Sequence, residues 1–341
     1  MPDAELGYLP PAGLPRLRAA VAAYLGRVRG VACEADQVVV CNGFAHGFSL
    51  VLRALADRGV LDVAVEVPGY DDPRNQIAWA GARAVAIPVD AEGVCTADLA
   101  ASPARAAVLT PAHQSPTGVV LSAPRRSELA DWVRAVDGWV VEDDYDAEFR
   151  YDRRPVGTMQ GADRSRVVLL GSVSKTLSPA LGIGWVVAPP SWVEPLRAAS
   201  GPPAGPPTLD QLAFAAFLQA GSYDRHLRGA RKRYRRRRDR LVRALAERLP
   251  EARLLGVAAG LHLVVLLDDA VDCAEVVGRV AAAGVRVADL DTYRCRDDAI
   301  GPGLVLGYGN LADAQLEEAV GLLVSAVAGA SVAYQPGANY T

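Results

Sequence analysis

Lys175 is the first residue whose chemistry stands out, because this chain uses lysine so rarely. Of its 36 lysines and arginines, only Lys175 and Lys232 are lysines. Lys175 lies in the segment Ser172–Thr176, which reads SVSKT and follows the apolar run Val167–Leu170. An amine can lose its proton and attack a carbonyl carbon, whereas a guanidinium stays protonated. The pattern therefore predicts a Schiff-base lysine between two serine hydroxyl groups at the end of a buried strand.

Three further polar segments also follow apolar runs. Asn42–Ala45 reads NGFA and precedes a helical pattern, so its free backbone N–H groups could hold a phosphate. Thr110–Gly118 reads TPAHQSPTG, and Glu142–Asp146 reads EDDYD. Open α/β sheets bind ligands at the carboxyl ends of their strands, so we expect these segments to meet at one site. Taken singly, each has a plainer interpretation: a tight turn, a polar loop or a solvated acidic loop.

One cofactor accounts for all four segments together. Pyridoxal phosphate carries a phosphate, a basic ring nitrogen, a phenolic oxygen and an aldehyde that captures a lysine. Asp143 is the candidate carboxylate that keeps the ring nitrogen protonated, and Tyr145 is the candidate partner of the phenolic oxygen. Lys175, once freed by substrate, could move a proton between carbon atoms.

The elements that would position these segments begin with a helix, predicted from the spacing of Leu14, Leu17, Val21 and Leu25. Short apolar runs without alternation then recur, which is typical of strands covered on both faces. These runs are Gln37–Cys41, Val63–Val67, Ala84–Ile87, Ala106–Leu109, Trp139–Val141, Val167–Leu170 and Ile183–Val187. With helical segments between several of them, they predict an α/β fold whose large domain is a doubly wound, mostly parallel sheet.

A smaller α+β C-terminal domain is predicted after the proline-rich stretch Ala199–Pro207. It would contain a long helix over Tyr223–Leu249, strands at Leu261–Leu267, Val285–Val287 and Leu304–Leu306, and a last helix from Leu316 to Val327. The predicted organisation is an N-terminal segment and helix (1–30), a large cofactor-binding domain (31–205), a small domain (206–330) and a flexible tail (331–341).

Composition narrows the classes of function. The net charge of −3 disfavours a general nucleic-acid binder, and no apolar run reaches about 18 residues, so we expect a cytoplasmic protein without a membrane partner. The five cysteines and four histidines lack the spacing of a disulfide framework or a metal site. The basic run Arg231–Arg238 leaves a nucleic-acid face as an alternative. Its helical spacing distributes the charges around the axis, which favours a solvated structural helix.

Six segments, in family order, resemble fold-type I pyridoxal phosphate enzymes of the class I/II aminotransferase group. The resemblance is closest to the aminotransferase-like domain of MocR-type regulators of the GntR family. The segments are Tyr8–Gly13, Arg29–Val31, Glu66–Tyr70, His113–Gly118, Glu142–Tyr151 and Ser172–Leu177. The resemblance implies the fold-type I transferase fold and pyridoxal 5'-phosphate as cofactor. MocR-type regulators also carry a DNA-binding module before this domain, and we expect none within these 341 residues.

The resemblance also assigns residues. Lys175 would form the Schiff base, Asp143 would contact the pyridine nitrogen, and Tyr145 the phenolic oxygen. The other implied cofactor-binding residues are Gly43, Phe44, Ala45, Ser172 and Ser174 at the phosphate, Tyr70 stacked on the ring, and Ser115 in the place of a family asparagine. Tyr8 would reach the phosphate of the neighbouring subunit, which implies a homodimer with shared active sites. Core or interface packing is the alternative for Tyr8 and Tyr70.

Two arginines of the family pattern are absent. Gly182 stands where an arginine usually clamps the phosphate, and Val305 stands where an arginine usually pairs with the substrate's α-carboxylate. Loss of this anchor weakens the expectation of a simple amino-acid transaminase, since charge-assisted bonds contribute about 1.5 to 3 kcal/mol each. Motif order suggests Arg74, Arg294 and Arg296 as replacements.

Several functions remain open at this point. The first is a pyridoxal phosphate enzyme of specialised metabolism that acts on an amine or modified amino acid through a lysine Schiff base and an α-carbanion. Its reaction would be transamination or, alternatively, elimination, replacement or carbon–carbon bond formation on an unusual or bulky substrate. A second function is a sensor domain that binds the cofactor and an effector without turnover. A degenerate, structural site is the third, and the intact Lys175, Asp143 and Tyr145 disfavour it.

Overall fold

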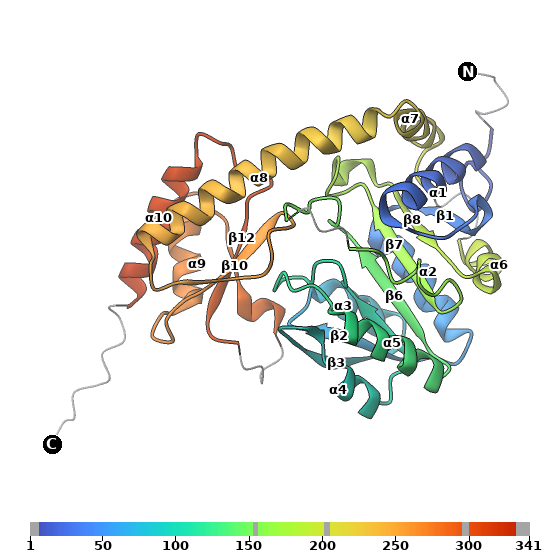
Figure 1. Ribbon diagram of the computed structural model, residues 1–341, viewed down its shortest axis with the longest axis horizontal. Helices are drawn as coiled ribbons and strands as arrows, with labels where there is room; N and C mark the ends of the chain where they lie inside the picture. The colour runs from blue at the N-terminus through green and yellow to red at the C-terminus, as the bar shows by residue number, and fades with distance from the viewer. Residues whose placement is uncertain (1–6, 153–155, 201–204, 295–299, 332–341) are drawn as a thin grey trace.

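The computed structural model describes residues 7–152, 156–200, 205–294 and 300–331 (Figure 1). Residues 332–341 of the predicted tail and residues 201–204 of the predicted proline-rich loop lie outside these ranges. Within the described ranges, no helix has both the length and the hydrophobicity needed to cross a membrane.

An eight-stranded sheet forms the larger part of the molecule. Its strands are β1 (Val38–Cys41), β2 (Asp62–Val67), β3 (Arg83–Asp90), β4 (Gly93–Val94), β5 (Ala106–Leu109), β6 (Trp139–Asp144), β7 (Val167–Ser172) and β8 (Gly184–Val187). They lie in the order β1-β8-β7-β6-β5-β2-β3-β4. Neighbours from β7 to β3 are parallel, whereas β8 is antiparallel to both β1 and β7, and β4 is antiparallel to β3. The predicted large, mostly parallel sheet is therefore confirmed.

Helices cover both faces of this sheet, which explains the continuous apolar runs. On β6, Val141 packs into the cluster beneath α2 (Gly43–Ala56) and α6 (Pro190–Ala199), whereas Val140 packs beneath α5 (Ala123–Ala135) on the other face. The remaining helices here are α1 (Pro15–Arg29), α3 (Asp71–Trp79), α4 (Thr96–Ala101), η2 (Ala35–Gln37) and η3 (Pro179–Leu181). Strand β3 differs from the expectation of full cover. Only its Ile87 is buried, because it lies near the edge with just the two-residue β4 beyond it.

A second, antiparallel sheet has the order β11-β12-β10-β9. Its elements are β9 (Arg253–Leu255), β10 (His262–Leu266), α9 (Cys273–Ala282), β11 (Ala288–Asp289), η4 (Leu290–Tyr293), β12 (Gly303–Gly307) and α10 (Leu316–Ser331). The predicted strand Val285–Val287 is wrong by a few residues, because sheet pairing begins only at Ala288. The three-residue β9 was not predicted, since so short a run has no recognisable period.

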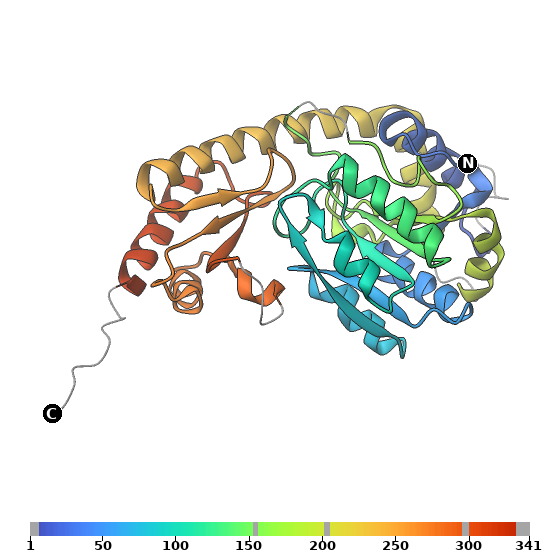
Figure 2. The same cartoon turned by 60° about the horizontal axis from the view of Figure 1, so that its bottom comes forward.

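The helix α8 (Ser222–Arg248) spans the two parts of the molecule, as Figures 1 and 2 show. At its start, Tyr223 packs against Tyr24 of α1 with ring centroids 5.1 Å apart. Here α8 follows α7 (Thr208–Gln219), a helix that the sequence analysis did not identify. The domain boundary between residues 205 and 206 stays a prediction, with α7 and the first turns of α8 packed on α1.

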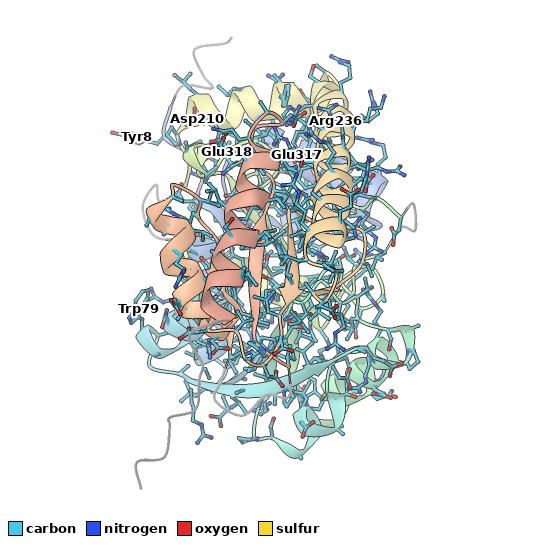
Figure 3. The ribbon with its side chains drawn as sticks, turned by 90° about the vertical axis from the view of Figure 1, so that its left-hand side faces the viewer. Tyr8, Trp79, Asp210, Arg236, Glu317 and Glu318 are labelled. Carbon is cyan, nitrogen blue, oxygen red and sulfur yellow. The ribbon has the colours of Figure 1, made fainter. Side chains whose placement is uncertain are left out.

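The basic run on α8 makes contacts within the chain. Arg231 donates from Nε to the Glu148 carbonyl over 2.8 Å, and Arg237 Nε lies 2.7 Å from Asp313 Oδ1. Asp313 precedes α10, which packs beside α8 (Figure 3). These contacts support the interpretation of Arg231–Arg238 as part of a structural helix.

Candidate functional site

A cavity of about 690 Å³ lies where β2, β5, β6 and β7 end, between the two sheets. The predicted site residues in its lining come from segments that are far apart in sequence. They are Gly43, Phe44, Ala45, Tyr70, Ser115, Asp143, Tyr145, Ser172, Ser174 and Lys175. Tyr8 is the exception: its side chain is 97% exposed and points away from the body of the molecule (Figure 3). The roles of all these residues stay predictions, but the side chains to which those roles are assigned line one cavity, Tyr8 excepted.

Lys175 follows β7 in a segment fixed by buried contacts. The Val173 N–H donates to the Ile183 carbonyl over 3.0 Å, which ties the segment to the start of β8. Thr176 is buried, and its Oγ1 accepts a 2.7 Å hydrogen bond from the Tyr223 hydroxyl. The exposed Lys175 therefore projects from a held backbone into the cavity.

The acids Glu142, Asp143 and Asp144 lie within β6, and Asp146 just after it is buried, so the segment is not the solvated loop considered as an alternative. Side chains alternate along a strand, so Asp143 faces the cavity while Glu142 and Asp144 point the other way. Glu142 accepts hydrogen bonds from two backbone N–H groups at 3.1 Å, and Asp144 pairs with Arg29. Burial raises the pKa of Glu142 to about 7, and the charge of Asp144 adds to this shift.

Asp143 is the acid positioned for chemistry. Its carboxyl makes no hydrogen bond with any other residue that the structure describes. Burial, followed by the charges of Asp144 and Asp146, raises its pKa well above the usual range, and the nearby Lys175 opposes this shift. Such a carboxyl will ionise readily only when a basic group approaches it, so it fits a basic nitrogen in the cavity.

Tyr145 is connected to a buried histidine. The Nδ1 atom of His113 lies 3.0 Å from the Tyr145 hydroxyl and 2.9 Å from Asp146 Oδ2. Burial and the charges of Asp146 and Asp143 raise the pKa of Tyr145 well above the usual range, while a hydrogen bond with Ser115 opposes the shift. The phenol is therefore neutral and held in position. Sequence reasoning quoted His113 within a motif but missed this connection.

The first turn of α2 and two serines form one end of the cavity. Gly43 begins α2 with a φ of +74°, and its backbone approaches Gly184 so closely that a Cβ on Gly184 would lie 2.7 Å from the Gly43 Cα. Ser172 and Ser174 face the same cavity. Backbone N–H groups at a helix N-terminus together with hydroxyl groups suit a phosphate. Gly182, at the position where the resemblance predicts an arginine, also lines the cavity.

Buried Glu66 begins the segment Glu66–Tyr70 of the family resemblance, but the sequence did not identify it as a site residue. Its Oε2 accepts hydrogen bonds from the backbone N–H and the hydroxyl of Thr110 over 3.0 and 2.6 Å. Burial nevertheless raises the pKa of Glu66 to about 7. An acid within the otherwise apolar run Val63–Val67 was the available signal.

The smaller sheet supplies the opposite wall, which sequence reasoning largely missed. His262 begins β10, and its Nε2 lies 3.0 Å from the Pro116 carbonyl oxygen. Burial and the neighbouring His113 lower the pKa of His262 to about 4, so its ring is neutral near pH 7. Val305 and Arg286 also belong to this wall. An arginine between two valines in a predicted strand was the available signal for Arg286.

Of the predicted replacements for the missing arginines, the two described ones, Arg74 and Arg294, do not line the cavity. Arg74 is paired with Asp71 on α3, and Arg294 donates to the Gly301 carbonyl and pairs with Asp291. Arg296 lies outside the described residues.

Comparisons with known proteins give the chain's relatives. It is 35% identical over 325 residues to the probable rhizopine catabolism regulatory protein MocR of Rhizobium meliloti, covering 94% of this chain and 65% of that protein. It is 33% identical to the HTH-type pyridoxine biosynthesis transcriptional regulator PdxR of Corynebacterium glutamicum, covering 88% of this chain and 65% of that protein. The chain thus spans about two thirds of the length of these curated relatives.

Solved structures give the fold. The Pyrococcus horikoshii kynurenine aminotransferase, solved in complex with PMP, superposes with a TM-score of 0.85 at 24% identity, covering 96% of this chain and 83% of that one. This likeness confirms the predicted fold-type I transferase fold. The family model described as aminotransferase class I and II matches residues 2–321. With the fold and this match in agreement over nearly the whole chain, the protein belongs to the aminotransferase class I and II family.

Proposed function

We propose that this chain binds pyridoxal 5'-phosphate covalently at Lys175 and acts on the amino group of a small-molecule substrate. One observation carries the proposal: Lys175, Asp143 and Tyr145, from two neighbouring strand ends, line a single cavity. Membership of the family supports the cofactor, as does the PMP in the Pyrococcus complex.

The residues present fit this cofactor. The first turn of α2, with Ser172 and Ser174, would hold the phosphate. Asp143 would contact the ring nitrogen, and its raised pKa would fall towards the ionised form beside a cation. Tyr145, held through His113, would donate a hydrogen bond to the phenolic oxygen. Tyr70 would lie against the ring.

When bound, the cofactor withdraws electrons from the substrate's α-carbon. The protein residues then supply positioning and proton transfer. Asp143 holds a proton on the ring nitrogen by its negative charge. The Lys175 amine, on a backbone fixed at Val173 and Thr176, accepts the proton from the α-carbon and returns it to another carbon. His262 on the opposite wall is neutral near pH 7, so it adds no positive charge to the cavity.

The substrate is an amine or a modified amino acid, because Val305 stands where the family pattern has the arginine that pairs with the α-carboxylate of common amino acids. Specialised metabolism is the setting that such a substrate favours. Transamination is the first reaction to test. Elimination, replacement and carbon–carbon bond formation on an unusual or bulky substrate are the alternatives that share the same α-carbon deprotonation.

A cofactor-binding sensor without turnover is the second candidate function. The observation that favours it is the similarity to MocR and PdxR, both described as regulatory proteins. Steady release of product from any amine in a panel would exclude the sensor. Cofactor binding and ligand-induced spectral change without product would exclude the enzyme.

Two lysines make the cofactor test simple. Protein incubated with pyridoxal 5'-phosphate is reduced with borohydride and digested, and the pyridoxyl group is located by mass spectrometry. We expect it on Lys175, and we expect Lys175→Ala to lose it while the matched Lys232→Ala variant, changed on α8, keeps it. Labelling of Lys232 alone, or equal labelling in Lys175→Ala, would contradict the proposal.

A twofold homodimer with shared sites completes the proposal. Exposed Tyr8 has no role within its own cavity, which suits a contact with a partner subunit. Light scattering should give twice the chain mass. Tyr8→Phe should weaken cofactor retention in the dimer. A monomer that retains the cofactor fully would contradict the shared site.

A further inference from the structure

Among the residues that the structure describes, Arg286 is the only arginine in the lining of the cavity. Its side chain is exposed and forms no hydrogen bond or ion pair with another residue in the described part of the chain. By contrast, Arg29, Arg74 and Arg294 all have carboxylate partners. Arg286 also borders a second hollow beside α10, so its long side chain lies at the rim between the two. A guanidinium in a cavity lining that has no partner among the described residues is available to a ligand.

The small sheet places Arg286 next to the position of the missing arginine. Ala288 of β11 is paired with Val305 of β12, and Arg286 lies two residues before Ala288. Arg286, Val287 and Ala288 all line the cavity. Val305 and Gly307 line the cavity, whereas Leu304 and Leu306 between and beside them do not. Gly307 contributes open space, because a Cβ there would meet no atom within 4 Å.

The charges of the two walls differ. The large-domain wall contains Lys175 with the acids Glu66, Asp72 and Asp143. On the described part of the small-domain wall Arg286 is the only charged side chain, because His262 is neutral near pH 7. The phosphate end, formed by α2 and β7, belongs to the large-domain wall. An anion held by Arg286 therefore belongs to the substrate rather than to the cofactor.

We propose that Arg286 binds a carboxylate of the substrate from the neighbouring strand, in place of the arginine that Val305 has replaced. The inference rests on the proposed function and narrows it to amines that carry a carboxylate. A guanidinium binds a carboxylate through two parallel N–H···O bonds, which fixes the orientation of the substrate as well as its affinity.

Calorimetry with a non-reacting probe tests this inference. Cofactor-loaded protein is titrated with 3-phenylpropanoate and with its uncharged amide. The Arg286→Ala variant should bind 3-phenylpropanoate with a Kd roughly 10- to 100-fold higher, as expected for loss of a charge-assisted contact. Its affinity for the amide should be unchanged. Arg286→Lys should bind the carboxylate with an affinity between those of the unchanged protein and Arg286→Ala, since an ammonium keeps the charge but lacks the two parallel N–H donors of a guanidinium. The matched control is Arg253→Ala, an exposed arginine of β9 at the other edge of the same sheet.

Three results would overturn the inference. They are equal carboxylate affinity in Arg286→Ala and the unchanged protein, no carboxylate binding by the unchanged protein, or weaker pyridoxal phosphate binding by Arg286→Ala without any effect on the carboxylate. The last would assign Arg286 to the phosphate. Borohydride labelling of Lys175 on the same samples separates the two proposals. Absent labelling counts against the cofactor, while titration of the cofactor-free protein still reports on Arg286.

Discussion

Replacing Arg29 with methionine tests how the site strand is held. Arg29 ends α1, and its Nε and Nη2 donate to the two oxygens of Asp144, each over 2.8 Å. Its Nη1 donates to the Val156 carbonyl, also over 2.8 Å. The side chains are only 6% and 4% exposed. This pair therefore connects the first helix to the strand that presents Asp143 to the cavity.

The expected loss of stability in Arg29→Met is large because the Asp144 carboxylate stays buried without its partner. Methionine keeps much of the apolar stem, but the Asp144 carboxylate stays buried near Glu142 and Glu148, without its partner. Removing one partner of a buried ion pair lowers the unfolding free energy by about 3 to 5 kcal/mol. In urea this corresponds to a fall in the midpoint of about 1 M or more, for a slope of about 3 kcal/mol per M.

Urea unfolding followed by circular dichroism gives the measurement. Arg134→Met is the matched control, because Arg134 pairs with Asp131 on the surface of α5 and an exposed pair contributes about 1 kcal/mol or less. The double variant Arg29→Met, Asp144→Leu removes the orphaned charge and should regain much of the stability. The reasoning is refuted if the double variant is no more stable than Arg29→Met alone.

Two further predictions concern the site. Burial raises the pKa of Glu66 from 4.5 to about 7, so the unfolded chain releases this proton first as pH rises. The free energy of unfolding therefore falls as the pH rises from about 4.5 to 7. Urea unfolding across this range should show that Glu66→Gln avoids up to about 3 kcal/mol of the fall. Parallel curves of stability against pH for the two proteins would contradict this prediction. Gly184→Ala places a Cβ 2.7 Å from the Gly43 Cα, so dialysis should show roughly tenfold weaker cofactor retention. Gly229→Ala, with no atom near its Cβ, is the control, and equal retention in both variants would contradict the steric argument.

Much of the fold could be predicted, because strands covered on both faces leave continuous apolar runs in the sequence. The runs Val63–Val67, Ala106–Leu109 and Val167–Leu170 all became buried strands of the large sheet. Elements held by tertiary contacts left no such signal. The edge strand β9 is three residues long, and β11 pairs over only two, so their positions depend on β10 and β12 rather than on local pattern.

The large-domain wall of the site could also be predicted, since parallel strands bring their carboxyl ends to one edge. That rule gathered Asp143, Tyr145 and Lys175 from two strand ends. It says nothing of the opposite wall. His262 and Arg286 reach the cavity only because α8 connects the second sheet to the rest of the molecule. The contact between His262 and Pro116 spans 146 residues of sequence, and such a separation leaves no local period.

The search for the missing arginines illustrates what local sequence can still decide. Arg74 and Arg294 were chosen by motif order, yet each has an aspartate three residues before it, and each pairs with that aspartate. Side chains three apart meet within one helical turn, so a local acid competes with any ligand for the guanidinium. Arg286 also has an aspartate three residues away, Asp289, but no ion pair joins them in the described structure, and the Asp289 carboxylate instead accepts a hydrogen bond from the Asp291 N–H. Sequence distance alone therefore does not distinguish Arg286 from Arg74 and Arg294. The difference is conformational, because Arg74 and Arg294 follow their aspartates within a helical turn, whereas Arg286 precedes strand β11.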